Sequence, residues 1–132
     1  MNKQGILHPE LARWVAKLGH HNYLLLTDAG YPHLDGIPHI DLGLTPGIPS
    51  FMDVLRPIVA ALPLEKVWLA TEFPDMNPTV YKEFLSLIPE ETVGFVGTHE
   101  QFKEKACAAL VVVRTGEFTP YANCLIECGV AF

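Results

Sequence analysis

The chain has 132 residues, of which 49% are hydrophobic and 18% are charged, a composition that suits one packed domain over residues 1–132 and excludes intrinsic disorder. The formal net charge is -6 and the nine Lys and Arg residues form no cluster, so nucleic acid, phosphorylated substrates and anionic membrane surfaces are poor partners. The mean hydropathy is positive, which favours apolar surface buried between subunits.

The N-terminus carries no apolar segment of the signal-peptide kind, and no apolar run reaches membrane-spanning length. The cysteines are Cys107, Cys124 and Cys128, an odd number whose spacing fits neither a disulfide framework nor a common zinc site. We therefore expect a cytoplasmic protein with free thiols.

Helix and strand patterns alternate from the first residues onward. Apolar residues at helical spacing predict a helix that begins near Pro9 and ends at Gly19. The apolar run 23–27 has the length of a buried strand and ends at Asp28. A loop rich in Gly and Pro then covers residues 29–38.

The next segment repeats this order of strand, helix and strand. Alternating apolar residues predict a strand over 39–44. Ser50 and Asp53 have the spacing of a helix start, and Pro57 is expected to kink or delay that helix. A buried strand is predicted over 66–71.

Two further helix starts are recognisable in the second half of the chain. Asn77 followed by Pro78 is typical of an N-cap with proline at the first helical position. Residues 92–97 predict a short strand, after which Thr98 and Gln101 form a capping box.

The remaining elements follow from the same patterns. A helix is predicted from His99 through about Ala106, and strands are predicted over 110–114 and 123–128. Strand and helix in rotation indicate an α/β fold, a single three-layer α/β/α domain with a largely parallel central sheet.

Three polar side chains lie where α/β folds usually carry their chemistry. Asp28 is at a strand end, His99 is at a helix start and His20 lies just beyond a helix end. His20 is a candidate general acid or base, or else a helix C-cap. Asp28 either orients His20 and accepts hydrogen bonds from a sugar, or only shapes a turn.

A polar pair lies behind Pro120, close to the C-terminus. Strand periodicity places Tyr121 and Asn123 on one face, where a phenol ring and a carboxamide suit a neutral polyhydroxyl ligand such as a sugar. The alternative is that both side chains only make turn and strand-edge hydrogen bonds.

Three charged residues are secondary candidates for the site. Lys103 lies one turn after His99 on the same helix face, and a solvated lysine is the alternative interpretation. Arg114 and Glu117 flank the turn at residues 115–116, where they are expected to form a local ion pair.

No cofactor or metal is predicted. His33, His39 and their aspartate neighbours do not form a recognisable ligand set. A phosphate-binding loop, a nucleophile elbow and a dinucleotide fingerprint are also missing from the sequence.

Four stretches carry a resemblance to a known family: KLGHHNYLLLTDAGYP, IDLGLTPGIPSFMDVL, THEQFKEKA and RTGEFTPYANCLIECGVAF. In this order they resemble the bacterial D-ribose pyranase family, part of a wider group of sugar mutarotases that includes L-fucose mutarotase. The resemblance covers nearly the whole chain. The stretch IDLGLTPGIPSF is more similar to the ribose branch than to the fucose branch.

The resemblance implies a cofactor-independent isomerase that interconverts the β-pyranose and β-furanose forms of D-ribose and so supplies ribokinase. It implies that His20 is the proton donor and that Asp28, His99 and the run Tyr121, Ala122, Asn123 bind the sugar, with Ala122 acting through its backbone. The alternatives are a mutarotase for another sugar, such as L-fucose, and a non-catalytic sugar-binding module.

The resemblance also implies a homo-oligomer, a decamer of two pentameric rings with sites between subunits. The C-terminal segment of one chain is expected to complete the site of a neighbour. The chain departs from the family pattern at Asn22, where an acidic residue is frequent, and at Tyr31 and His33, where smaller or aliphatic residues are common.

Overall fold

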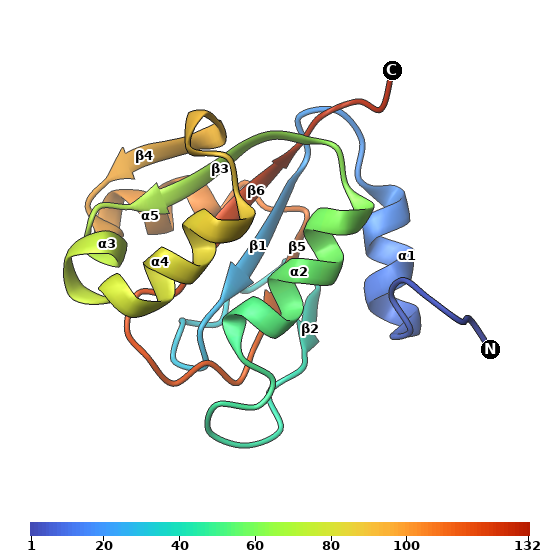
Figure 1. Ribbon diagram of the computed structural model, residues 1–132, viewed down its shortest axis with the longest axis horizontal. Coiled ribbons are helices and arrows are strands. Elements are labelled where there is room, and N and C mark those ends of the chain that lie inside the picture. The colour runs from blue at the N-terminus through green and yellow to red at the C-terminus, as the bar shows by residue number, and fades with distance from the viewer.

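The computed structural model describes residues 1–132 and is built around one sheet (Figure 1). The strands are β1 (Tyr23–Thr27), β2 (His39–Asp41), β3 (Leu64–Ala70), β4 (Val93–Gly97), β5 (Val111–Arg114) and β6 (Cys124–Cys128). They form a six-stranded sheet in the order β2-β5-β1-β6-β3-β4. Only β6 runs antiparallel to its neighbours, β1 and β3, so the predicted largely parallel sheet is confirmed.

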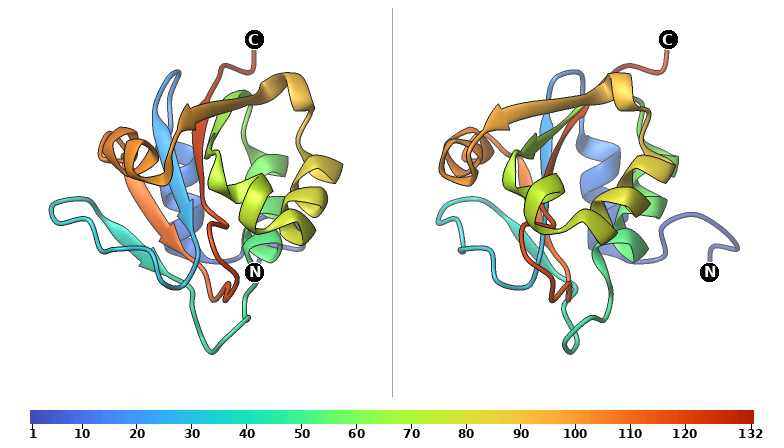
Figure 2. Two further views of the ribbon diagram at one scale, coloured as in Figure 1. Left: turned by 90° about the vertical axis from the view of Figure 1, so that its left-hand side faces the viewer. Right: turned by 60° about the vertical axis from the view of Figure 1, so that its left-hand side comes forward.

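Helices cover both faces of this sheet. They are α1 (Pro9–Lys17), α2 (Phe51–Ala61), α3 (Glu72–Met76), α4 (Pro78–Leu87) and α5 (His99–Ala106), with a 3-10 turn, η1 (Glu90–Thr92). The first four pack on one face and α5 on the other, as the turned views in Figure 2 show, which confirms the three-layer fold. None of these helices has the length and apolar character needed to cross a membrane.

The burial of both sheet faces explains the unbroken apolar run in β1. Leu24 and Leu26 belong to the larger core under α1–α4, while Leu25 between them belongs to the smaller core under α5. All three side chains are fully buried. A central strand with two buried faces has no polar face, so its residues do not alternate.

Side-chain caps begin the helices where the sequence predicts them. Ser50 and Asp53 form a reciprocal capping box at the start of α2, and Thr98 and Gln101 form another at the start of α5. The helix α2 already begins at Phe51, before Pro57, so the proline does not delay it.

Several element boundaries differ from the predictions. The strand β2 ends at Asp41 rather than at residue 44, because its sole partner β5 ends at Arg114, directly opposite. The helix α3 and the turn η1 were not predicted, because each is too short to show a periodic pattern.

The two ends of the sheet carry different parts of the chain (Figure 1). The carboxyl ends of β1 and β5 lie beside the loop that leads into α2. The α1–β1 connection and the C-terminus lie at the opposite end, because β6 runs antiparallel to β1.

Candidate functional site

A reciprocal pair of polar side chains joins β1 to the start of β6. The Asn123 Oδ1 accepts a hydrogen bond of 2.8 Å from the Asp28 backbone N–H, and the Asn123 Nδ2 donates one of 3.1 Å to Asp28 Oδ2. The other carboxylate oxygen of Asp28 accepts from the Gly30 N–H at 2.9 Å. Asn123 is buried, so the pair holds the Asp28 carboxylate in one orientation.

The surroundings of Asp28 raise its pKa above the ordinary aspartate value. Burial is the main cause, because a carboxylate that loses water is disfavoured. The hydrogen bonds from Gly30 and Asn123, together with the nearby His99, oppose this effect without cancelling it. A carboxylate with a raised pKa is a stronger proton acceptor than an ordinary aspartate.

His99 is the first residue of α5, and the adjacent α3 holds its backbone. Its N–H donates to both carboxylate oxygens of Glu72, at 3.0 and 2.9 Å, and this contact is the main reason that the pKa of Glu72 is lowered. The His99 ring meets the Tyr121 ring edge-on, with 5.1 Å between the ring centroids.

A turn, not a strand, presents Tyr121 and Asn123. The strand β6 begins only at Cys124, and Tyr121 has a left-handed backbone with φ of 60°. The Asn123 N–H closes the turn on the Tyr121 carbonyl at 2.8 Å, around the buried Ala122. The prediction of one shared strand face is therefore wrong, although both side chains do serve the same site.

Two helix N-termini fasten the loop before this turn. Glu117 accepts hydrogen bonds from the Phe51 N–H at the start of α2, at 2.9 Å, and from the Thr119 hydroxyl, at 2.8 Å. The amide of Asn77, the N-cap of α4, donates to Thr119 Oγ1 at 2.8 Å and to the Pro120 carbonyl at 2.9 Å.

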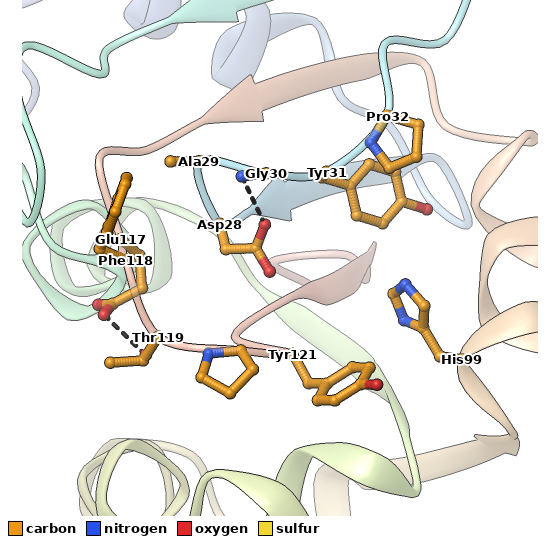
Figure 3. A pocket seen from close by; sticks show the side chains of 11 residues that line it. Asp28, Ala29, Gly30, Tyr31, Pro32, His99, Glu117, Phe118, Thr119 and Tyr121 are labelled. Atoms are coloured by element: carbon orange, nitrogen blue, oxygen red, sulfur yellow. Dashed lines mark hydrogen bonds between the residues drawn. The ribbon is translucent and has the colours of Figure 1, made fainter.

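These segments line a cavity of ≈ 430 Å³ that is open to solvent (Figure 3). Its lining residues are Asp28, Ala29, Gly30, Tyr31, Pro32, His99, Glu117, Phe118, Thr119, Pro120 and Tyr121. They supply two carboxylates, an imidazole, two phenols, a hydroxyl and apolar surface. This chemistry suits a small neutral ligand with several hydroxyl groups.

The structure contradicts the expectation that Asp28 orients His20. The whole of β1 separates the two residues, and five strand residues span roughly 17 Å. His20 lies at the other end of the sheet, where its Nε2 is 3.7 Å from Glu65 Oε2 and its ring stacks on His21 with 3.7 Å between centroids. Within one chain, therefore, His20 does not reach the cavity.

The start of the C-terminal segment contacts the candidate site of its own chain. Tyr121, Ala122 and Asn123 adjoin Asp28 and His99 of their own chain, and together these residues form one site. His20 is the one principal candidate that lies apart from this group.

The secondary candidates have other partners than those predicted. Arg114 contacts Asp41 at 2.7 Å and the Ala29 carbonyl at 3.0 Å, so it forms no ion pair with Glu117. Glu117 instead caps α2 and holds the cavity loop, as described above. Lys103 pairs with Glu100 at 2.8 Å and does not line the cavity.

One group of side chains has the composition of a metal site. The ligand atoms of His20, His21 and Glu65 lie within 4.8 Å of one another, and all three residues are exposed. His21 is already engaged through its Nδ1, which lies 2.8 Å from Glu127 Oε2. This group is remote from the cavity.

Sequence reasoning missed several residues that build the site. Tyr31 was noted from the sequence only as a departure from the family pattern, and it lines the cavity. Glu72 and Thr119 hold His99 and the loop, and their contacts span long sequence separations, which no local pattern reveals. Asn77 was predicted as a cap, but its second role in holding Pro120 has no local sequence signal.

The fold and the cavity define a three-layer α/β protein with a polar, sugar-type site at the carboxyl end of β1. A model of the RbsD / FucU transport protein family matches residues 1–131, and the chain belongs to this family. The D-ribose pyranases of Bacillus velezensis and Bacillus subtilis are each 42% identical to it over 132 residues, covering 100% of both chains.

Solved structures agree with this assignment. The structure of Bacillus subtilis RbsD complexed with D-ribose has a TM-score of 0.94 and 42% identity, with 100% of both chains covered. The fucose mutarotase of Streptococcus pneumoniae in complex with L-fucose has a TM-score of 0.79 at 24% identity, covering 96% of this chain and 95% of that one, and is similar in fold.

Proposed function

We propose that the chain is a D-ribose pyranase, which interconverts the β-pyranose and β-furanose forms of D-ribose. The observation that carries this proposal is the cavity in which the Asp28–Asn123 pair faces His99 and Tyr121. The proposal is supported by sequence identity: the chain is 42% identical along its full length to proteins named D-ribose pyranase. It has the same identity to the Bacillus subtilis RbsD chain whose structure is complexed with D-ribose.

The reaction needs only proton transfers. An acid protonates the ring oxygen while a base removes the proton of the anomeric hydroxyl, so that the ring C–O bond breaks and an aldehyde forms. Rotation of the open chain then brings a different hydroxyl to the carbonyl carbon, and the reverse transfers close the new ring. A positioned acid or base contributes about 10²–10⁴-fold to such a rate.

We assign these roles to named residues. His20 is the proton donor, because a protonated imidazole can give its N–H proton to the ring oxygen of the sugar. Asp28 binds a sugar hydroxyl and is suited to accept a proton, because burial raises its pKa. His99, Tyr121 and the backbone of Ala122 hold the remaining hydroxyls, and Asn123 keeps Asp28 in place.

His20 reaches the cavity of a neighbouring subunit in this proposal. Large apolar side chains are exposed at both ends of the sheet: Leu44 and Phe118 beside the cavity, and Val130 and Phe132 beyond β6. Contact between two different patches repeats head to tail, and it gives a ring when the rotation between subunits closes. We propose a decamer of two pentameric rings, a size that analytical ultracentrifugation can test. The cytoplasmic location stays a prediction.

The proposed activity is tested by NMR exchange spectroscopy between the ring forms of D-ribose. The wild-type protein is expected to accelerate the exchange, and His20→Ala is expected to lose about 10²-fold or more in rate while still binding ribose. Saturable ribose binding without faster exchange would favour a non-catalytic module instead. Faster exchange of L-fucose than of D-ribose would favour a mutarotase for another sugar.

A further inference from the structure

Two side-chain polar atoms in this chain are buried without a hydrogen-bond partner among the protein groups: Tyr31 Oη and His99 Nδ1. Leaving a buried polar group unpaired is unfavourable, so such atoms are rare and need an explanation. Both residues line the same cavity. Two orphan atoms that coincide with a candidate binding site indicate groups that pair with a ligand.

Packing places the two side chains next to each other. The Tyr31 ring meets the His99 ring edge-on with 6.0 Å between centroids, and it meets Phe102 in the same way at 6.4 Å. The hydroxyl end of Tyr31 lies beside the His99 ring in Figure 3. Tyr31 is only 8% exposed, and burial raises its pKa, so it is a neutral donor at physiological pH.

The His99 ring packs against Tyr31, Phe102 and Tyr121, and its Nδ1 has no hydrogen-bond partner among the protein groups. The hydrogen bonds of His99 to Glu72 come from the backbone N–H, and none holds the ring itself. A hydroxyl group both donates and accepts, so one hydroxyl can pair with Tyr31 Oη and with His99 Nδ1 in either tautomer. An apolar ligand atom at this position would leave both groups unpaired.

We propose that Tyr31 is a specificity-determining residue, which together with His99 Nδ1 binds one hydroxyl of the sugar. This inference rests on the proposed function, because it names a further contact within the same cavity. Tyr31 selects the sugar by its hydroxyl pattern: a substrate without the matching hydroxyl leaves two buried groups unpaired. Such a site discriminates more strongly than apolar packing does.

The first test is Tyr31→Phe, which removes one oxygen atom and keeps the ring. We expect the Kd for D-ribose to rise by about 5- to 20-fold, since a buried hydrogen bond to the ligand is lost. The thermal midpoint of the ligand-free protein is expected to stay the same or to rise, because an unpaired hydroxyl has been removed. Tyr81→Phe, which removes the same atom outside the cavity, is the matched control and should leave ribose affinity unchanged.

The second test identifies the hydroxyl. The affinities of wild type and Tyr31→Phe are compared for 2-deoxy-, 3-deoxy- and 5-deoxyribose by NMR titration. The deoxy sugar that lacks the paired hydroxyl should bind both proteins equally, whereas the others should retain the difference seen with ribose. A lower thermal midpoint with unchanged ribose affinity would show a structural role for the Tyr31 hydroxyl and overturn the proposal.

A wild-type protein that neither binds ribose nor accelerates its exchange would overturn the proposed function itself. A wild-type protein that does both, beside a Tyr31→Phe protein of equal affinity for ribose and all three deoxy sugars, would overturn the role of Tyr31 alone.

Discussion

At the residue scale, the Asp28 carboxylate combines a functional position with a cost in stability. Its pKa is higher in the folded chain than the value of about 3.9 in an unfolded chain, so the folded state binds this proton more tightly. The ionised form at neutral pH therefore lowers the free energy of unfolding, and this cost disappears as the pH falls. Asn123 limits the cost through its amide hydrogen bond.

The Asp28–Asn123 pair predicts the acid limb of the activity profile. The ionised Asp28 is the form that accepts a sugar hydroxyl, so kcat/KM should fall with decreasing pH through a pKa above the usual aspartate range. Asn123→Asp keeps the shape and the oxygen that accepts from the Asp28 N–H, but places a second carboxylate beside the first. The acid limb should move up by about one pH unit or more. A pH–rate profile with an unmoved limb contradicts the assignment to Asp28.

At the element scale, the helices with side-chain caps and the apolar strands were predictable, because their signals lie within a few residues. The caps at Ser50, Asn77 and Thr98 are examples. The turn at Tyr121 was not predictable from periodicity, since its left-handed backbone interrupts the strand pattern just before β6. The contacts that hold the cavity loop were also not predictable from local sequence patterns, because Asn77 and Thr119 are 42 residues apart.

Two helix caps allow the structural and functional roles of a cap to be separated. Asn77→Ala removes the cap of α4 together with the hydrogen bonds to Thr119 and Pro120, while Ser50→Ala removes only the exposed cap of α2. Ser50→Ala should lower the free energy of unfolding by about 1 kcal/mol, measured by urea denaturation. Asn77→Ala should lower it by about 2 kcal/mol or more, because two further hydrogen bonds of a buried side chain are lost. Only Asn77→Ala should also weaken ribose binding, because it releases the cavity loop. Equal ribose affinity in the two variants would show that the loop does not depend on Asn77.

At the scale of the whole molecule, the α/β class was predictable from the order of the elements, and so were the positions of Asp28 at a strand end and His99 at a helix start. Which of the site residues lie together was not predictable. No local sequence pattern indicates that β6 lies antiparallel between β1 and β3. This strand order brings Asn123 to Asp28. The short separation between His20 and Asp28 suggested one shared site, yet an extended strand carries them to opposite ends of the sheet. Proximity in sequence favours proximity in space only where the chain turns back.

This separation predicts that two inactive variants restore activity in a mixed assembly. His20→Ala lacks the proton donor but keeps an intact cavity, and Asp28→Ala lacks the cavity carboxylate but keeps His20. If each site combines the cavity of one subunit with His20 of the next, co-expression in equal amounts gives about one complete site in four, and thus about a quarter of the wild-type exchange rate. If both residues act within one chain, every site lacks one group and the mixture stays as inactive as either variant alone.

Wild type mixed with His20→Ala serves as the control for assembly, with about half of the sites expected to be complete. NMR exchange of D-ribose measures all three mixtures under identical conditions, so the ratio of rates, rather than any absolute rate, decides between the two arrangements.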